Sequence, residues 1–171
     1  GMVYLSCHSN AITTLPNLPA SLTVLDAPAN QLTEIPALPP VLQSLRCGNN
    51  LLTDLPTLPS TLYDLWCEDN QLTALPNLPT GLTELKCYNN QLTALPALPT
   101  ALTRLDAGQN QFTTLPQLPS GLTYLWIPDC QITAFPTLPA SLLTFNCNAN
   151  QCTQLPALPN GLRHLQCSMP T

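Results

Sequence analysis

Hydrophobic residues recur at six places in every block of 20 residues, without an insertion or deletion along the chain. In residues 81–100 these places hold Leu82, Leu85, Cys87, Leu92, Leu95 and Leu98. Self-similarity at a fixed short period is typical of a solenoid, whose units bury their apolar faces against each other. We therefore predict a single domain over residues 1–171, with about eight complete repeats of 20 residues and a partial ninth. Places are numbered from 1 to 20 within each block, so that residues 5, 25 and 45 all occupy place 5.

Apolar and polar residues alternate over places 4 to 8, which predicts one short strand in each repeat. Leu85 and Cys87 then face one way, and Glu84, Lys86 and Tyr88 face the other.

The return segment over residues 95–99 contains two prolines three residues apart, which remove amide donors and disfavour helix. We expect extended backbone of the polyproline II type there, with Leu95 and Leu98 turned inward. The predicted fold is a gently curved parallel β-sheet on the concave face and extended segments on the convex face, with little or no helix.

Polar residues recur as strictly as the apolar ones. Asparagine occupies place 10 in every complete repeat except one, where Cys130 replaces it. Because an amide both donates and accepts hydrogen bonds, we expect these side chains to link successive repeats. Threonine occupies place 13 from Thr13 to Thr153, and we expect a second ladder of hydroxyl groups there.

Charged residues make up only 8% of the chain, against about a quarter in ordinary proteins, and the formal net charge is −5. Such a surface repels phosphate backbones and anionic headgroups, so we expect no nucleic-acid partner and no membrane insertion. No apolar run approaches the roughly 20 residues that span a bilayer. No signal peptide is visible at the start of the sequence.

The cysteines are predicted to be buried thiols. Six of the eight occupy place 7: Cys7, Cys47, Cys67, Cys87, Cys147 and Cys167. Adjacent strands lie about 4.8 Å apart, whereas a disulfide places Cβ atoms about 3.8 Å apart, so stacked equivalents pair poorly. A bridge between Cys130 and Cys152 stays an alternative. With no Cys-x-x-Cys pair and with His8 and His164 in opposite end repeats, we expect no metal, no cofactor and no catalytic residues.

Places 4, 6, 8 and 9 carry ten of the thirteen charged residues and both tryptophans. Because Trp, Tyr and Arg dominate binding hot spots, we expect a partner-binding patch on the concave face of the central strands. Its candidate residues are Asp64, Trp66, Glu84, Lys86, Tyr88, Arg104, Asp106, Tyr124 and Trp126. The alternative is that these charges merely pair with each other and keep the sheet soluble.

Residues 82–99, LTELKCYNNQLTALPALP, resemble the leucine-rich repeat in its short bacterial form, LxxLxLxxNxLxxLPxLPxx. The resemblance covers essentially the whole chain, and proteins that look like this include the YopM- and IpaH-type effectors, whose repeat domains this sequence resembles. It implies a leucine-rich repeat solenoid of the α/β-horseshoe superfamily, nearly all-β here, whose concave face binds proteins. The frequent cysteine at place 7 is similar to repeats of bacterial surface or lipoprotein-like proteins.

Some proteins of this family carry a helical cap or a helical ubiquitin-ligase domain. This sequence opens inside the first repeat and stops inside the ninth strand, with neither, so ligase activity is not carried over. Cys67-Glu68-Asp69 matches the ligase Cys-x-Asp motif as a string, but Cys67 shares its place with Cys47 and Cys87 and is expected in the core. The uncapped ends lead us to expect end-to-end self-association or flanking sequence.

These observations favour a non-catalytic module that recognises another protein, of bacterial origin, either secreted into a host cell or at the bacterial surface. One alternative is a glycan-binding or adhesion module in which Trp66 and Trp126 stack on sugar rings. Another is the substrate-recognition domain of a ubiquitin ligase whose catalytic domain is absent from this chain.

Overall fold

The computed structural model describes residues 1–168 and forms one nine-stranded parallel sheet with the strands in sequence order. The last residues of the predicted partial ninth repeat, 169–171, lie outside this range. The strands are β1 (Tyr4–Ser6), β2 (Val24–Asp26), β3 (Ser44–Arg46), β4 (Asp64–Trp66), β5 (Glu84–Lys86), β6 (Arg104–Asp106), β7 (Tyr124–Trp126), β8 (Thr144–Asn146) and β9 (His164–Gln166).

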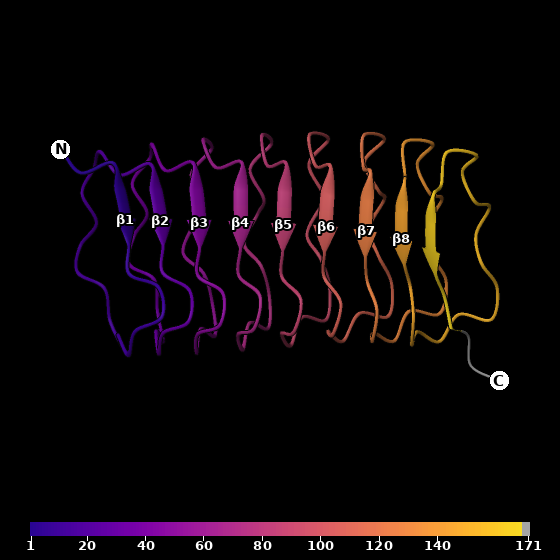
Figure 1. The fold of residues 1–171 in the computed structure, drawn as a ribbon, viewed down its shortest axis with the longest axis horizontal. Coiled ribbons are helices and arrows are strands. Elements are labelled where there is room, and N and C mark those ends of the chain that lie inside the picture. Colours follow the sequence, from indigo (N-terminus) through magenta and orange to yellow (C-terminus); the bar gives the residue numbers. More distant parts are fainter. Residues whose placement is uncertain (169–171) are drawn as a thin grey trace.

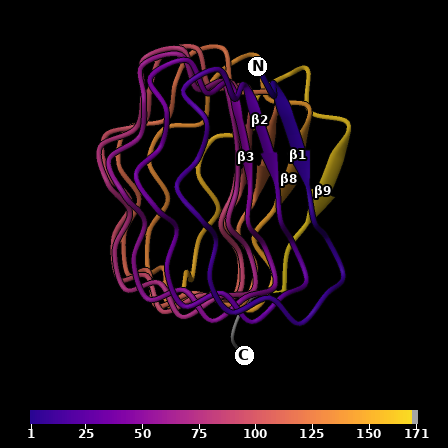
Figure 2. The ribbon, with the colours of Figure 1, turned by 90° about the vertical axis from the view of Figure 1, so that its left-hand side faces the viewer.

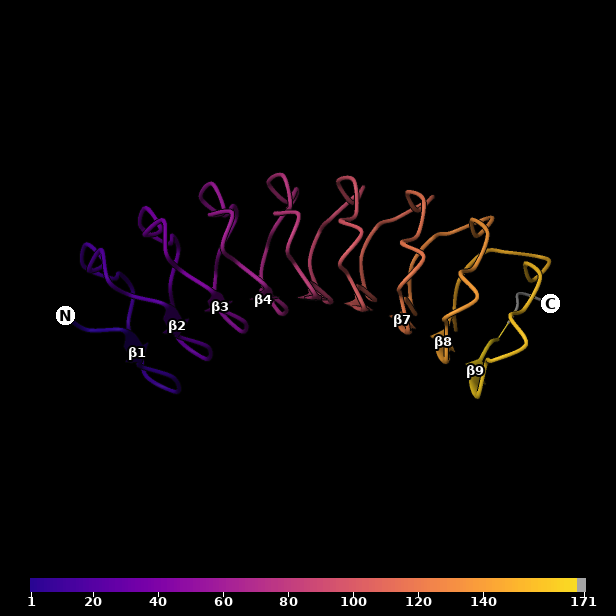
Figure 3. The same ribbon diagram turned by 90° about the horizontal axis from the view of Figure 1, so that it is seen from above.

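The register of the sheet equals the repeat length. Leu65 pairs with Leu85, and Leu85 pairs with Leu105, so equivalent places stack directly from strand to strand. Figure 1 shows the strands side by side, and Figure 2 views the array from its β1 end, with the strands on one side and the return segments on the other. The sheet follows the inner side of a shallow arc (Figure 3). The predicted solenoid and its gentle curvature are confirmed.

The core consists of the apolar places of the repeat. Leu82, Leu85 and Leu92 have no exposed surface, and the same holds for their equivalents in the neighbouring repeats. In the return segment Leu95 is buried and Leu98 is half-buried, as expected. No helix occurs within residues 1–168, and none there is therefore long and apolar enough to cross a membrane.

The asparagine ladder at place 10 is confirmed. The Asn90 Nδ2 donates to the carbonyl oxygens of Cys67 and Cys87, each 3.1 Å away, and its Oδ1 accepts from the Leu72 amide at 2.9 Å. At Cys130 the thiol lies 3.9 Å from the Ala107 carbonyl oxygen and 3.5 Å from that of Pro128. Cysteine therefore replaces only part of what the amide supplies.

The expected hydroxyl ladder at place 13 is wrong. Each of the eight place-13 threonines, from Thr13 to Thr153, is exposed, and its hydroxyl makes no hydrogen bond among the described residues. The hydroxyl ladder lies at place 3 instead, where Thr103 donates to the Thr83 carbonyl and Thr123 to the Thr103 carbonyl, both at 3.1 Å. Place 3 directly precedes a strand, where the backbones of successive repeats run close together. Place 13 instead lies on the outer bend of the repeat.

Place 9 adopts the left-handed backbone conformation in each of eight successive repeats, and no glycine occupies it. The φ angles lie between 52° and 57°, and they include Ala29 and Ala149 as well as Asn49 and Asn89. The left-handed conformation costs energy for alanine, whose side chain forms no hydrogen bond, whereas asparagine tolerates it.

All eight cysteines are free thiols. Cys47, Cys67 and Cys87 are fully buried, and burial raises the pKa of each thiol well above its ordinary value. The prediction of buried thiols is confirmed at these places. The alternative bridge is wrong, because Cys130 and Cys152 are separate buried thiols.

Candidate partner-binding face

The register brings the nine predicted residues together over β4 to β7. Trp66 pairs with Lys86, Lys86 with Asp106, and Asp106 with Trp126, so place 6 forms one row across four strands. Place 4 forms a second row, and Tyr88 follows the end of β5. We call this set the concave patch, because it lies on or just after strands β4 to β7, and the sheet follows the inner side of the arc (Figure 3). Its members are Asp64, Trp66, Glu84, Lys86, Tyr88, Arg104, Asp106, Tyr124 and Trp126.

The indole of Trp66 lies between two cations of this same chain. The Arg46 guanidinium carbon is 4.2 Å from the ring centre, and the Lys86 Nζ is 3.3 Å from it. Cations are attracted to the faces of aromatic rings, so these contacts stabilise the arrangement. Trp66 is consequently half-buried, and it is more enclosed than its expected place on an open face suggests.

Asp64 also differs from the expectation of a solvent-facing residue. Its side chain is only 6% exposed, and its Oδ2 accepts from the Ser44 hydroxyl at 2.8 Å and from Arg46 at 3.1 Å. Three buried polar atoms in this region have no hydrogen-bond partner among the described residues: Asp64 Oδ1, Trp66 Nε1 and Glu68 Oε2.

The expected pairing of charges occurs at part of the patch. The Glu84 Oε1 lies 3.7 Å from the Lys86 Nζ and 3.5 Å from the Arg104 Nε. Together with the pair between Arg46 and Asp64, this gives every cation of the concave face an acidic partner. Asp106, by contrast, makes no ion pair within the part of the chain that the structure describes.

Three side chains form a stacked row across β6 and β7. The rings of Tyr124 and Trp126 are 5.7 Å apart and inclined by only 6°, and the Arg104 guanidinium carbon lies 4.2 Å from the Tyr124 ring centre. This row orders one side of the Trp126 indole.

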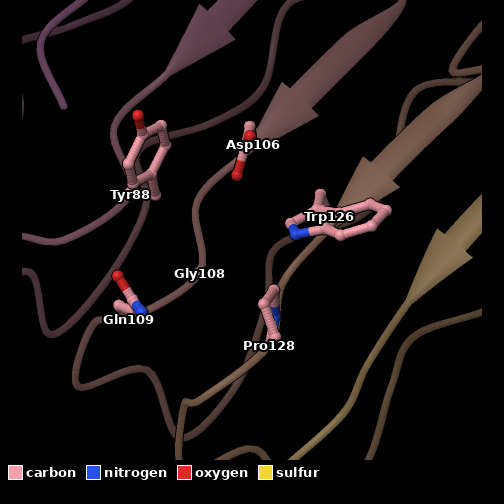
Figure 4. A pocket seen from close by; sticks show the side chains of 6 residues that line it. All are labelled: Tyr88, Asp106, Gly108, Gln109, Trp126 and Pro128. Atoms are coloured by element: carbon pink, nitrogen blue, oxygen red, sulfur yellow. The ribbon is translucent and has the colours of Figure 1, made fainter. Parts of the chain in front are cut away.

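A pocket of about 300 Å³ opens beside Trp126. Tyr88, Asp106 and Trp126 line it, together with Gly108, Gln109 and Pro128, and Asp106 lies between the two aromatic side chains (Figure 4). Gly108 allows Pro128 to pack closely against it, since a Cβ there would lie 2.5 Å from the Pro128 Cδ. Gly108, Gln109 and Pro128 are not among the residues predicted from the sequence. The small residue at place 8 was the available signal.

Burial raises the pKa of Asp106 to about 6, while the nearby charges of Lys86 and Arg104 and the Gly108 amide act in the opposite direction. When a carboxylate is partly removed from water and lacks an ion-pair partner, a nearby positive charge stabilises its ionised form.

The other candidate chemistry lies apart from this patch. No group of three or more His, Cys, Asp or Glu side chains within residues 1–168 is arranged to hold a metal ion. His8 follows β1 and His164 begins β9, at opposite ends of the array. Cys67 is in the core, as expected, so the Cys-x-Asp string is not an exposed nucleophile.

The 20-residue register, the short parallel strands and the asparagine ladder define the class as a leucine-rich repeat protein. Comparison with solved structures agrees. YopM, a leucine-rich effector protein from Yersinia pestis, shares 33% identity over 92% of this chain and 52% of its own, with a TM-score of 0.82. The leucine-rich repeat domain of a Shigella effector shares 34% identity over 87% of this chain and 70% of its own, with a TM-score of 0.77. The chain belongs to the family of bacterial leucine-rich repeat proteins.

The functional domain of InlJ from Listeria monocytogenes is similar at 27% identity over 98% of this chain and 49% of its own, with a TM-score of 0.67. That domain is described as including a cysteine ladder, and Cys47, Cys67 and Cys87 form a comparable column here. This chain spans about half the length of the YopM and InlJ structures. No family model and no curated protein matches the sequence.

Proposed function

We propose that this chain is a non-catalytic module that recognises another protein through the concave patch. The observation that carries the proposal is the concentration of ten of the thirteen charged residues and both tryptophans on the concave places. The convex side instead carries mostly alanine, threonine, asparagine and proline. Leucine-rich repeat domains of the effector-like kind are protein-interaction modules in general, which supports a protein partner.

The physical state of the patch also supports binding. Its aromatic side chains are held in fixed positions by stacking and by cations, so little conformational entropy is lost when a partner covers them.

Glycan binding is the competing function. A sugar ring needs an open aromatic face, and the Trp66 indole is already flanked by Arg46 and Lys86. Trp126 stacks with Tyr124 on one side and borders the pocket, so of the two tryptophans it is the one that offers a platform of this kind.

Affinity capture tests the proposal. The immobilised chain, its Trp126→Ala variant and its Tyr63→Ala variant are incubated with a host-cell lysate and, in parallel, with a glycan array. Tyr63 is the matched control, because it is an exposed aromatic residue at place 3, outside the patch. We expect one protein to bind the wild type and Tyr63→Ala but not Trp126→Ala, with circular dichroism unchanged. A captured protein that Trp126→Ala retains, or binding to glycans alone, would contradict the proposal.

The wider context follows from the same family. We propose a bacterial origin and a location inside a host cell or at the bacterial surface. A role as the substrate-recognition part of a ubiquitin ligase would require a catalytic domain beyond this sequence.

End-to-end self-association through the edge strands β1 and β9 is a further proposal, and light scattering across a range of protein concentrations tests it.

A further inference from the structure

We infer that the pocket lined by Tyr88, Asp106 and Trp126 receives a cationic side chain, arginine or lysine, of the partner protein. This inference rests on the proposed function and specifies the chemistry of the contact. The pocket combines a carboxylate with two aromatic side chains, which is the combination that attracts a cation by charge and by the ring quadrupole.

The concave patch already uses this chemistry elsewhere. Arg46 and Lys86 flank Trp66, and Arg104 covers Tyr124. Trp126 is the one indole of the described chain with no cation of this protein over its ring. Its environment therefore resembles that of Trp66 with the cation missing.

The charge of the face points the same way. Its acidic residues number seven and its basic residues three. Glu84 contacts two of the three cations, and Asp64 contacts the third, so the remaining carboxylates have no ion-pair partner within the described chain. The acidic residues outside these pairs are Asp26, Glu68, Asp69, Asp106 and Asp129. A partner surface that is positively charged complements this face and is attracted to it.

The dimensions suit one side chain. A volume of about 300 Å³ lies at the lower end of the range for small-molecule pockets. Gly108 and Pro128 both line it and pack closely, because a Cβ on Gly108 would lie 2.5 Å from the Pro128 Cδ. A neutral ring in the same space would leave the Asp106 carboxylate partly desolvated and without an ion-pair partner, which is unfavourable.

Titration with two small probes tests the inference. N-acetyl-L-argininamide carries the guanidinium, and N-acetyl-L-citrullinamide has nearly the same shape without the charge. The indole resonance of Trp126 is followed by NMR at pH 7.5 in the full chain. We expect saturable millimolar binding of the arginine probe and at least tenfold weaker binding of the citrulline probe. Methyl glucoside, a sugar probe, is expected not to bind.

Two variants separate charge from structure. Asp106→Asn keeps the shape of the side chain and is expected to abolish the preference for the arginine probe. Asp129→Asn is the matched control, since it removes an exposed carboxylate of the same face that does not line the pocket, and it should retain the preference.

Equal binding of both probes, no binding of either, or a preference that survives Asp106→Asn would overturn the inference. If Trp126→Ala still abolishes capture of the partner protein in that case, the proposed function stands and only the cation pocket is wrong. If capture is also insensitive to Trp126→Ala, the proposed function fails as well.

Discussion

The side-chain amide of Asn90 donates to the carbonyl oxygen of Cys67, 3.1 Å away on the preceding repeat. The same nitrogen donates to the carbonyl oxygen of Cys87 in its own repeat at 3.1 Å, and its oxygen accepts from the Leu72 amide. One buried side chain thus satisfies backbone groups of two successive repeats, which explains why place 10 varies so little along the chain.

Replacing Asn90 by alanine is expected to lower the free energy of unfolding by about 3 kcal/mol, because several buried backbone groups lose their partner. The reciprocal change, Cys130→Asn, should raise it by about 1 kcal/mol by completing the ladder. Urea unfolding followed by circular dichroism measures both. A Cys130→Asn variant no more stable than the wild type would show that the ladder contributes little.

Ala149→Asn is expected to stabilise the chain by about 0.5–1 kcal/mol, since Ala149 has a φ of 52° and asparagine accepts the left-handed region at lower cost. Ala94→Asn is the control, because Ala94 is also exposed and is not among the positive-φ residues. Thermal unfolding of the two variants should therefore differ. Equal midpoints would mean that place 9 carries no strain.

The stacked thiols are expected to resist alkylation in the folded chain. The thiolate is the reactive form, and burial raises the pKa of Cys67 and its neighbours while also blocking access. With iodoacetamide at pH 8, mass spectrometry should find the half-buried Cys7 and Cys167 modified first and Cys47, Cys67 and Cys87 modified only after denaturation. Rapid labelling of Cys67 in the native chain would refute its core position.

The carboxyl group of Asp106 should titrate near pH 6 in the folded chain, against a pKa of about 3.9 when unfolded. Because the folded pKa is the higher one, this group favours the folded state fully below pH 4, and that contribution is lost as the pH rises through 6. Asp106→Asn should remove this dependence, so the variant gains stability relative to wild type between pH 4 and pH 7. Carbon-detected NMR of the carboxyl resonance gives the midpoint, and a midpoint below 4.5 would contradict the expectation.

The groups that surround this carboxyl group determine the shift. Those of opposite charge are Lys86 on β5 and Arg104 on β6, and both lower the pKa of Asp106. The acidic or ionisable groups whose own pKa Asp106 raises are Glu68, Cys87, Tyr88 and Tyr124. The net upward shift therefore reflects burial and not a single neighbouring charge.

The fold was predictable because each place of the repeat has one role. Leu85 and Cys87 are buried, as are the residues at the same places in the other central repeats, so period and alternation alone assign the inside and the outside of the sheet. The asparagine ladder was predictable for the same reason, since Asn90 has both donors and an acceptor. The prediction of a hydroxyl ladder at place 13 was wrong, because regular recurrence alone does not distinguish a hydrogen-bonding residue from one on a solvent-facing bend.

The site was predictable only as a surface. The pattern placed Trp66, Asp106 and Trp126 in one row, and the register confirms that row. Contacts within the row depend on side-chain conformations, which a repeat pattern does not contain. Thus the cations around Trp66, the burial of Asp64 and the pocket beside Gly108 emerged only from the structure.

Photo-crosslinking tests the central claim most directly, since it reports which face the captured partner touches. Tyr88 on the concave face and Ala94 on the exposed outer bend are each replaced, one at a time, by p-benzoylphenylalanine. Irradiation of the complex should join the partner to position 88 and leave position 94 unlinked. Crosslinks formed from position 94 alone, or equally from both positions, would contradict recognition through the concave patch.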